Sequence, residues 1–181
     1  MKQGDVILQR WRIRMAGRHL PPGAHVLDIG CSDGLLFSVL KDKIASGVGV
    51  DDDSVPGDYG AFRFIRGRAP DDLPAGETFD AVTLLAVLEH IPAETQRKLA
   101  EDCWALLGDT GLVICTVPSP RVDTVIHLGK QLRILDGMQE HEHYGFEPSH
   151  TVSLFVDRGF TLRHARRFQL GLNNLFVFAK G

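Results

Sequence analysis

The segment with the clearest chemical potential runs from Val26 to Leu36 and reads VLDIGCSDGLL. A strand of aliphatic residues carries Asp28 near its end and leads into two glycines four positions apart, Gly30 and Gly34. Glycine lets the backbone turn tightly and approach a ligand where a Cβ atom would collide. The helix expected next offers free N–H groups and a favourable dipole to ligand oxygens. The segment therefore predicts a ligand-binding loop outside the carboxyl end of the first strand.

The glycine spacing of this loop argues against a dinucleotide. After Ile29 the chain reads Gly-Cys-Ser-Asp-Gly, so it lacks the second and third glycines of GxGxxG that accommodate a pyrophosphate. A nicotinamide-dependent oxidoreductase is thereby disfavoured, and it would be recognised by binding of NAD or NADP.

A second acidic position follows in GVGVDDD, Gly47 to Asp53. Asp51 ends a predicted strand, 21 residues after Gly30, and a carboxylate at this place can accept hydrogen bonds from both hydroxyls of a ribose. Asp52 begins the side where a base would lie. A solvated acidic turn would explain Asp52 and Asp53 equally well, whereas the spacing from the glycine loop favours a binding role for Asp51.

Taken in order, these segments resemble the class I (Rossmann-like) S-adenosylmethionine-dependent methyltransferases of small-molecule type. Val26 to Leu36 resembles motif I of the family, and FDAVTLLAVLEHI, Phe79 to Ile91, resembles its fourth strand. LLGDTGLVICTVPSP, Leu106 to Pro120, matches the fifth-strand region, and HEHYGFEPSHTVSLFVDRGF resembles the C-terminal part. The resemblance covers about residues 20 to 181. It implies S-adenosylmethionine as cofactor and methyl transfer by in-line displacement on carbon.

The resemblance also implies which residues bind the cofactor, from the glycine loop, the second strand end, the turn after the third strand and the end of the fourth strand. They are Asp28, Gly30, Cys31, Ser32, Gly34, Asp51, Asp52, Arg68, Ala69, Leu84, Leu85 and Ala86. One position departs from the family, which commonly has a Gly-Asp-Ala turn whose carboxylate holds the adenine amino group. Here the turn reads Gly67-Arg68-Ala69, and arginine cannot accept a hydrogen bond. Either Asp71 or Asp72 substitutes, or backbone groups alone hold the adenine.

Two histidines are candidates for the base that a hydroxyl acceptor requires, because histidine titrates near neutral pH. His143 is the first candidate, since its loop is expected over the carboxyl ends of the strands, and His90 is the second. The alternative for each of them is a purely structural role, which is common for histidines in loops. Some relatives bind a divalent metal through a Glu-His pair and a glutamate three residues earlier, but before Glu89-His90 that position is Ala86, so no metal is expected.

The elements that must position these residues are predicted to form one α/β domain over residues 1–181. Apolar runs alternate with amphipathic stretches, which favours a doubly wound, mostly parallel seven-stranded sheet with an antiparallel C-terminal strand and helices on both faces. An N-terminal helix is expected within residues 1–20, a helix over Leu35 to Ile44, a helix from Pro92 that stops at Gly108, and a substrate cap over 121–158. The predicted strands are Val26 to Ile29, Gly47 to Asp51, Phe62 to Ile65, Phe79 to Leu85, Leu112 to Val117, Phe160 to Phe168 and Asn174 to Ala179.

The composition of the chain limits the classes of binding partner that are expected. The chain has 181 residues, a formal net charge of -3 and no segment of about 18 apolar residues, so neither a nucleic acid partner nor a membrane span is expected, and a cytoplasmic location follows. The mixed apolar and basic cap suits a small-molecule, glycan or lipid-linked acceptor, methylated on oxygen or nitrogen. A catalytically weak S-adenosylmethionine-binding regulatory or partner subunit is the alternative. The sequence does not give the oligomeric state.

Overall fold

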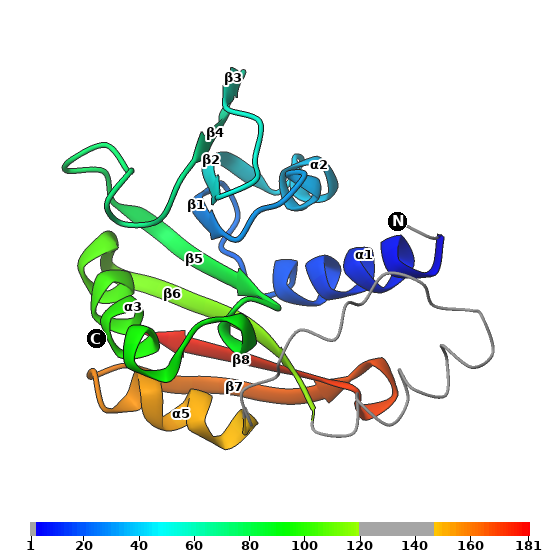
Figure 1. Cartoon of the computed structure of the whole chain (residues 1–181), viewed down its shortest axis with the longest axis vertical. Helices are drawn as coiled ribbons and strands as arrows, with labels where there is room; N and C mark the ends of the chain where they lie inside the picture. The colour runs from blue at the N-terminus through cyan, green and yellow to red at the C-terminus, as the bar shows by residue number, and fades with distance from the viewer. Residues whose placement is uncertain (1–2, 120–146) are drawn as a thin grey trace.

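Eight strands form one sheet in the order β3-β4-β2-β1-β5-β6-β8-β7 (Figure 1). The computed structural model describes residues 3–119 and 147–181. β1, β2, β4, β5 and β6 run parallel, whereas β8 is antiparallel to both β6 and β7. The strands are β1 (Ala24–Ile29), β2 (Ile44–Asp51), β3 (Gly57–Tyr59), β4 (Phe62–Arg66), β5 (Phe79–Leu85), β6 (Leu107–Pro118), β7 (Thr161–Phe168) and β8 (Asn173–Ala179).

Helices cover both faces of this sheet, as predicted. α1 (Gln3–Gly17) and α2 (Leu35–Leu40) pack on one face, and α3 (Ala93–Leu106) and α5 (Pro148–Val156) pack on the other. Two short 3₁₀ helices, η1 (Leu88–His90) and η2 (Gln169–Gly171), follow β5 and β7. No helix in the described ranges is long and apolar enough to cross a membrane. The predicted fold class, a doubly wound and mostly parallel α/β sheet, is confirmed.

Three details differ from the prediction. β3 is an eighth strand within the connection after Asp52, where it forms an antiparallel hairpin with β4. α2 ends at Leu40, and Ile44 instead begins β2, paired with Ala24. Gly108 does not end a helix with a loop, because β6 starts directly at Leu107 and runs through it. In each case strand pairing, which a local helical pattern does not report, determines the outcome.

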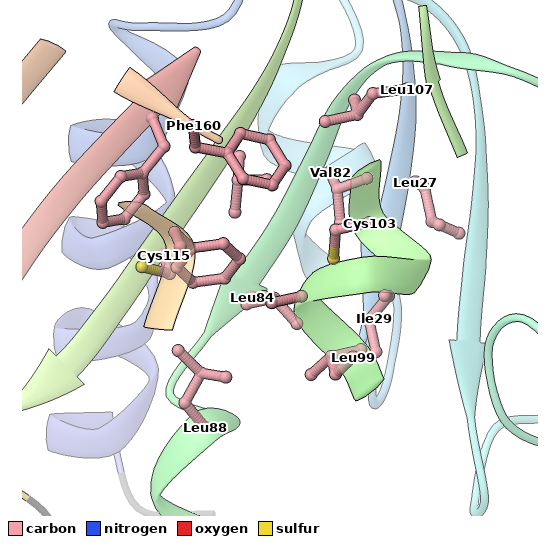
Figure 2. Close-up of a cluster of buried hydrophobic side chains, with 14 of the residues drawn as sticks. Leu27, Ile29, Val82, Leu84, Leu88, Leu99, Cys103, Leu107, Cys115 and Phe160 are labelled. Carbon is pink, nitrogen blue, oxygen red and sulfur yellow. The ribbon is translucent and has the colours of Figure 1, made fainter. Parts of the chain in front are cut away.

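The alternation of side chains along the strands divides the core into two layers. Val113, Cys115 and Val117 of β6 face α3 and α5, and Ile114 faces α1 and α2. Figure 2 shows the first layer, in which Leu99 and Cys103 of α3 pack over the strands. Each large aliphatic side chain buried in this way stabilises the fold by about 1.5–3 kcal/mol relative to exposure. These layers fix the register of β1, β2 and β5, whose carboxyl ends carry the predicted site.

Candidate functional site

A pocket of about 580 Å³ lies at the carboxyl ends of β1, β2 and β4, beside η1 and α3. Six residues of the predicted site line it: Gly30, Asp51, Asp52, Arg68, Ala69 and His90. Apolar side chains complete the wall, namely Ile29, Val50, Val87, Ile91 and Leu99. A concave, partly apolar pocket with a few converging polar groups is the usual form of a small-molecule site.

The glycine loop after β1 makes this pocket possible. Gly30 has a φ of 75°, and its N–H donates to the carbonyl of Val50 at 2.8 Å, which ties the loop to the end of β2. A Cβ atom at Gly30 would lie 2.5 Å from Cγ2 of Val87. Gly34 also has a positive φ and begins α2, and a Cβ there would collide with the ring of Phe64. Both positions therefore require glycine for conformation and for space.

Asp51 is fixed at the pocket wall by backbone donors. Its Oδ2 accepts the N–H of Ser32 at 3.0 Å, and its Oδ1 accepts the N–H of Asp53 at 2.9 Å. These bonds join the glycine loop to the end of β2 and hold the carboxylate in one orientation. Each carboxylate oxygen has a further lone pair that can accept a bond from a ligand.

Asp28 lies beneath the loop, almost fully buried on β1. Its Oδ1 accepts a hydrogen bond of 2.6 Å from the hydroxyl of Thr83 on β5. Burial raises the pKa of Asp28 to about 7, the Thr83 bond opposes this rise, and the nearby charge of Asp51 adds to it. A cation bound above the loop would therefore stabilise the ionised form of Asp28.

The turn after β4 shows how Arg68 is accommodated. Nη2 and Nε of Arg68 donate to Oδ2 of Asp52 at 2.8 and 3.0 Å, and this hydrogen bonding lowers the pKa of Asp52. The backbone N–H of Arg68 donates to Oδ2 of Asp72 at 2.8 Å, so Asp72 closes the turn. Asp71, in contrast, lines the pocket. Of the two carboxylates considered for the adenine amino group, Asp71 lines the pocket and Asp72 does not.

The remaining predicted cofactor residues do not line the pocket. Leu84 is buried in the core, and Leu85 and Ala86 follow it at the end of β5, where the Ala86 N–H donates to the carbonyl of Thr116. Cys31 packs under the loop against Gly49, and burial raises the pKa of its thiol to about 12. Asp28, Ser32 and Gly34 support the loop by the contacts given above.

Of the two histidines predicted as candidate bases, one lies in the described part of the chain. His90 lies on η1 and lines the pocket, with its N–H donating to the carbonyl of Val87 at 3.0 Å. His143 lies outside the described residues. Within residues 3–119 and 147–181, no group of three or more His, Cys, Asp or Glu side chains is placed to hold a metal ion.

Several lining residues were not predicted. Thr95, Lys98 and Asp102 of α3 face the pocket, and Lys98 Nζ pairs with Asp102 Oδ2 at 2.7 Å. Their spacing of three and four residues marks one polar face of the helix, which is the signal that could have identified them. Nothing in the local sequence indicates that this face turns toward the glycine loop, because α3 and β1 are brought together only by the sheet order.

Comparisons with known proteins agree with this architecture. The ubiquinone biosynthesis O-methyltransferase of Psychrobacter arcticus is 27% identical over 157 residues, which cover 77% of this chain and 60% of that protein. The enzyme of the same name from Xanthomonas campestris strain B100 is 34% identical over 94 residues, 43% of this chain and 37% of that protein. This chain thus spans less than two thirds of the length of these curated relatives.

A solved structure shows the same fold. The 1,6-didemethyltoxoflavin-N1-methyltransferase of Burkholderia thailandensis, solved with 1,6-didemethyltoxoflavin and S-adenosylhomocysteine, superposes with a TM-score of 0.71 at 19% identity and covers 97% of this chain and 81% of that one. The model of the family described as "Methyltransferase domain" matches residues 2–165 of this chain. The chain therefore belongs to the methyltransferase domain family, which confirms the family resemblance predicted from the sequence.

Proposed function

We propose that this chain binds S-adenosylmethionine in the pocket beside η1 and transfers the methyl group to a hydroxyl group of a small-molecule acceptor. The observation that carries the proposal is the position of Asp51, whose carboxylate lines the pocket next to Gly30 while two backbone N–H groups fix it. A fixed carboxylate beside a glycine loop suits the ribose hydroxyls of a nucleoside ligand.

The rest of the pocket divides into regions for the other parts of the cofactor. Val50, Ala69 and Leu99 offer apolar surface to the adenine, and Asp71 offers an acceptor to its amino group. The methionine end would lie over Gly30 and against Val87 and His90, above the buried Asp28. The absence of a GxGxxG pattern fits this ligand, because S-adenosylmethionine contains no phosphate.

Methyl transfer requires alignment more than a nucleophilic side chain. When bound, S-adenosylmethionine supplies an electrophilic methyl group, and the protein contributes positioning of the acceptor and exclusion of water. A hydroxyl acceptor must lose a proton, for which His90 at the pocket wall is the candidate among the described residues, and His143 stays a candidate outside them. Oxygen is proposed as the methylated atom because both curated relatives are named O-methyltransferases.

Isothermal titration calorimetry with S-adenosylhomocysteine tests the cofactor part of this proposal. We expect the wild type to bind, Asp51→Asn to bind about tenfold more weakly or worse because it replaces a ribose acceptor, and Asp53→Asn to bind like the wild type. Asp53 is a matched control because it is exposed and adjacent. Absence of binding by the wild type would contradict the proposal.

Transfer of a radiolabelled methyl group tests the reaction. The wild type, incubated with labelled S-adenosylmethionine and the small-molecule fraction of a cell extract, should label a compound of that fraction, and Asp51→Asn should label it more slowly at cofactor concentrations below saturation. Binding of S-adenosylhomocysteine without any labelling would favour the alternative of a regulatory or partner subunit.

A further inference from the structure

The turn between β7 and β8 exposes a leucine almost completely. Leu170 in η2 is 97% exposed, the largest fraction among the large hydrophobic side chains of the described residues. Its φ is 58°, and Gln169 before it has a φ of 50°, so two consecutive residues with a Cβ atom occupy the left-handed region. Such residues adopt this conformation only where surrounding contacts hold them in it. The fold thus keeps an apolar side chain in water in a disfavoured backbone conformation.

Hydrogen bonds hold this turn against α1 and β8. Gln169 is buried, and its Nε2 donates to the carbonyl of Leu8 in α1 at 2.7 Å. Its Oε1 accepts a hydrogen bond from Nδ2 of Asn173 at the start of β8. The turn that carries Leu170 is therefore fixed in place beside the N-terminal half of α1.

That half of α1 adds two more exposed apolar side chains beside the turn. Ile7, which precedes the Leu8 that Gln169 contacts, is 63% exposed. Trp11 lies four residues later on the same side of the helix and is 41% exposed. Figure 1 shows this half of α1 and the turn after β7 at the same side of the molecule. Grouped exposed apolar side chains mark an interaction surface, and we call Ile7, Trp11 and Leu170 the apolar tip.

Arginines surround the apolar tip. On α1, Arg10 and Arg14 are exposed and lie three residues beyond the two apolar residues, hence on the same side of the helix. On β7, Arg166 and Arg167 are exposed and lie just before the turn. The apolar tip is thus bordered by positive charge from both elements.

The sequence concentrates positive charge in this part of the molecule. The whole chain has a formal net charge of -3, yet residues 158–181 contain four arginines and one lysine and no aspartate or glutamate. α1 contains three arginines and one acidic residue, Asp5. The apolar tip therefore complements a partner that is itself anionic.

The apolar side chains distinguish between anionic partners. At the interface of a lipid bilayer, Leu, Ile and Trp side chains enter the boundary of the acyl region while arginines contact headgroup phosphates. A nucleic acid could contact the arginines and stack on Trp11, but its phosphates would leave Ile7 and Leu170 in water. A bilayer accommodates all parts of the surface together.

The apolar tip lies at the edge of the sheet that carries the pocket. β6 and β7 are each antiparallel to β8, so they run in the same direction and end at the same edge. β6 is also parallel to β5, whose end leads into η1 at the pocket wall. A bilayer in contact with the apolar tip would therefore lie at the edge of the sheet where ligands enter.

We infer that the apolar tip and the four arginines around it form a docking surface for an anionic lipid bilayer. The tip enters the interface between headgroups and acyl chains, and the arginines bind lipid phosphates. The association is peripheral and reversible, because one turn and one side of a helix supply the whole surface. It goes beyond the proposed function and is measured without cofactor or acceptor.

Flotation with lipid vesicles tests the docking. Vesicles of phosphatidylcholine mixed with an equal amount of phosphatidylglycerol should bind the wild type about tenfold more tightly than vesicles of phosphatidylcholine alone. High salt should weaken this binding, because it screens the arginines from the lipid phosphates. Equal affinity for the two compositions, or no binding to the anionic vesicles, would overturn the inference.

Leu170→Asn is the sharpest variant. Asparagine tolerates the left-handed conformation better than leucine, so the variant should keep or raise the melting temperature while it removes the apolar side chain. Its affinity for anionic vesicles should fall about tenfold. Val55→Asn is the matched control, since Val55 is an exposed aliphatic residue next to β3, at the opposite edge of the sheet. Equal binding by Leu170→Asn and the wild type would contradict the docking.

Arginine variants test the electrostatic contribution. Arg14→Gln and Arg166→Gln should each weaken binding to anionic vesicles about fivefold. Arg97→Gln, at an exposed position of α3, is the control and should bind normally. Weaker binding in the arginine variants with no loss in Leu170→Asn would assign the surface to a polyanion such as RNA and overturn the lipid inference.

Tryptophan fluorescence reports whether the apolar tip enters the bilayer. The chain has two tryptophans, and Trp104 packs against Phe160 with ring centroids 4.9 Å apart. On anionic vesicles the emission should move to shorter wavelength as Trp11 leaves water. Trp11→Phe, which retains only Trp104, should show no such change, and a change that persists in this variant would exclude insertion at Trp11.

Two further measurements separate this inference from its alternatives. Sedimentation velocity without lipid should show the same species for the wild type and Leu170→Asn. A wild-type dimer that Leu170→Asn converts to a monomer would instead assign the apolar tip to contact between two copies of the chain. Failure of vesicle binding with normal S-adenosylhomocysteine binding would overturn the docking and leave the proposed function intact.

Discussion

Arg68 and Asp52 form a salt bridge at the edge of the pocket, in which Nη2 and Nε of the arginine donate to Oδ2 of the aspartate at 2.8 and 3.0 Å. Their side chains are 79% and 56% exposed, so the pair lies in solvent and adds little to stability. The salt bridge instead determines where the Arg68 side chain lies. The side chain of Arg68 is turned toward Asp52, and the pocket wall at this turn also includes Ala69, Pro70 and Asp71.

Asp71 is therefore expected to recognise the adenine amino group. Asp71→Ala should weaken binding of S-adenosylhomocysteine about tenfold and leave binding of S-inosylhomocysteine, which lacks that amino group, unchanged. Asp72→Ala removes the acceptor of the Arg68 N–H and should weaken both ligands alike. Calorimetric titration of the two ligands into the two variants checks this. A wild type that binds both ligands equally would show that no side chain reads the amino group.

Gly30 should be intolerant of substitution for two separable reasons. A Cβ atom would meet Val87 at 2.5 Å, and the φ of 75° is itself strained for other residues. Gly60 has a φ of 67° but open space around its Cβ position, so Gly60→Ala measures the conformational cost alone, about 1 kcal/mol. Gly30→Ala should lower the free energy of unfolding by more than this and should abolish S-adenosylhomocysteine binding. Chemical denaturation of the two variants measures the difference, and equal losses would exclude the steric contribution.

The parts of the site that could be predicted are those fixed by consecutive residues. The loop from Asp28 to Gly34 and the strand end at Asp51 depend on local backbone geometry, which glycine spacing and a strand pattern report directly. The sequence does not distinguish Asp71 from Asp72, because only the closed turn shows which carboxylate accepts the N–H of Arg68. Thr95 and Lys98 could not be assigned, since their approach to Gly30 depends on the packing of α3 across β1 and β5.

The fold, like the site, has parts that the local sequence predicts and parts that depend on contacts between distant residues. Apolar runs in the sequence predict the buried strands β1, β2, β5 and β8, whereas they do not predict the β3 hairpin, because Gly57–Tyr59 is short, polar and paired only with β4. Glycine at position 108 predicts the end of α3 there, but Leu107 already pairs with Phe79 and begins β6. Pairing partners distant in the sequence decide both cases.

Asp28 should make stability depend on pH in an identifiable range. Its pKa is raised from 3.8 to about 7 in the folded protein, chiefly by burial. Between these values the folded protein binds a proton that the unfolded chain has released, so stability falls as pH rises and becomes constant above about pH 7. Asp28→Asn keeps an acceptor for the Thr83 hydroxyl and removes the titration. The unfolding free energy of the variant minus that of the wild type should grow by about 1.4 kcal/mol per pH unit from pH 5 to 7.

Urea denaturation of the ligand-free proteins at several pH values measures this difference. The subtraction isolates Asp28 because Glu89, whose pKa is also raised to about 7 by burial, titrates in both proteins. Parallel stability profiles for the wild type and Asp28→Asn would show that Asp28 stays ionised in the folded state.

The same titration should appear in cofactor binding. S-adenosylmethionine carries positive charge on its sulfonium and amino groups, and we expect its methionine end above Asp28, so it favours the ionised carboxylate. Affinity should therefore rise as pH increases toward 7, by up to about tenfold per unit below the pKa of Asp28, and should level off above it. Asp28→Asn should bind more weakly with no such slope, and His90→Asn, which alters the other titratable side chain considered at this end of the pocket, should keep it. Calorimetry from pH 5.5 to 8 gives the slopes, and a slope that persists in Asp28→Asn but disappears in His90→Asn would assign the titration to the histidine.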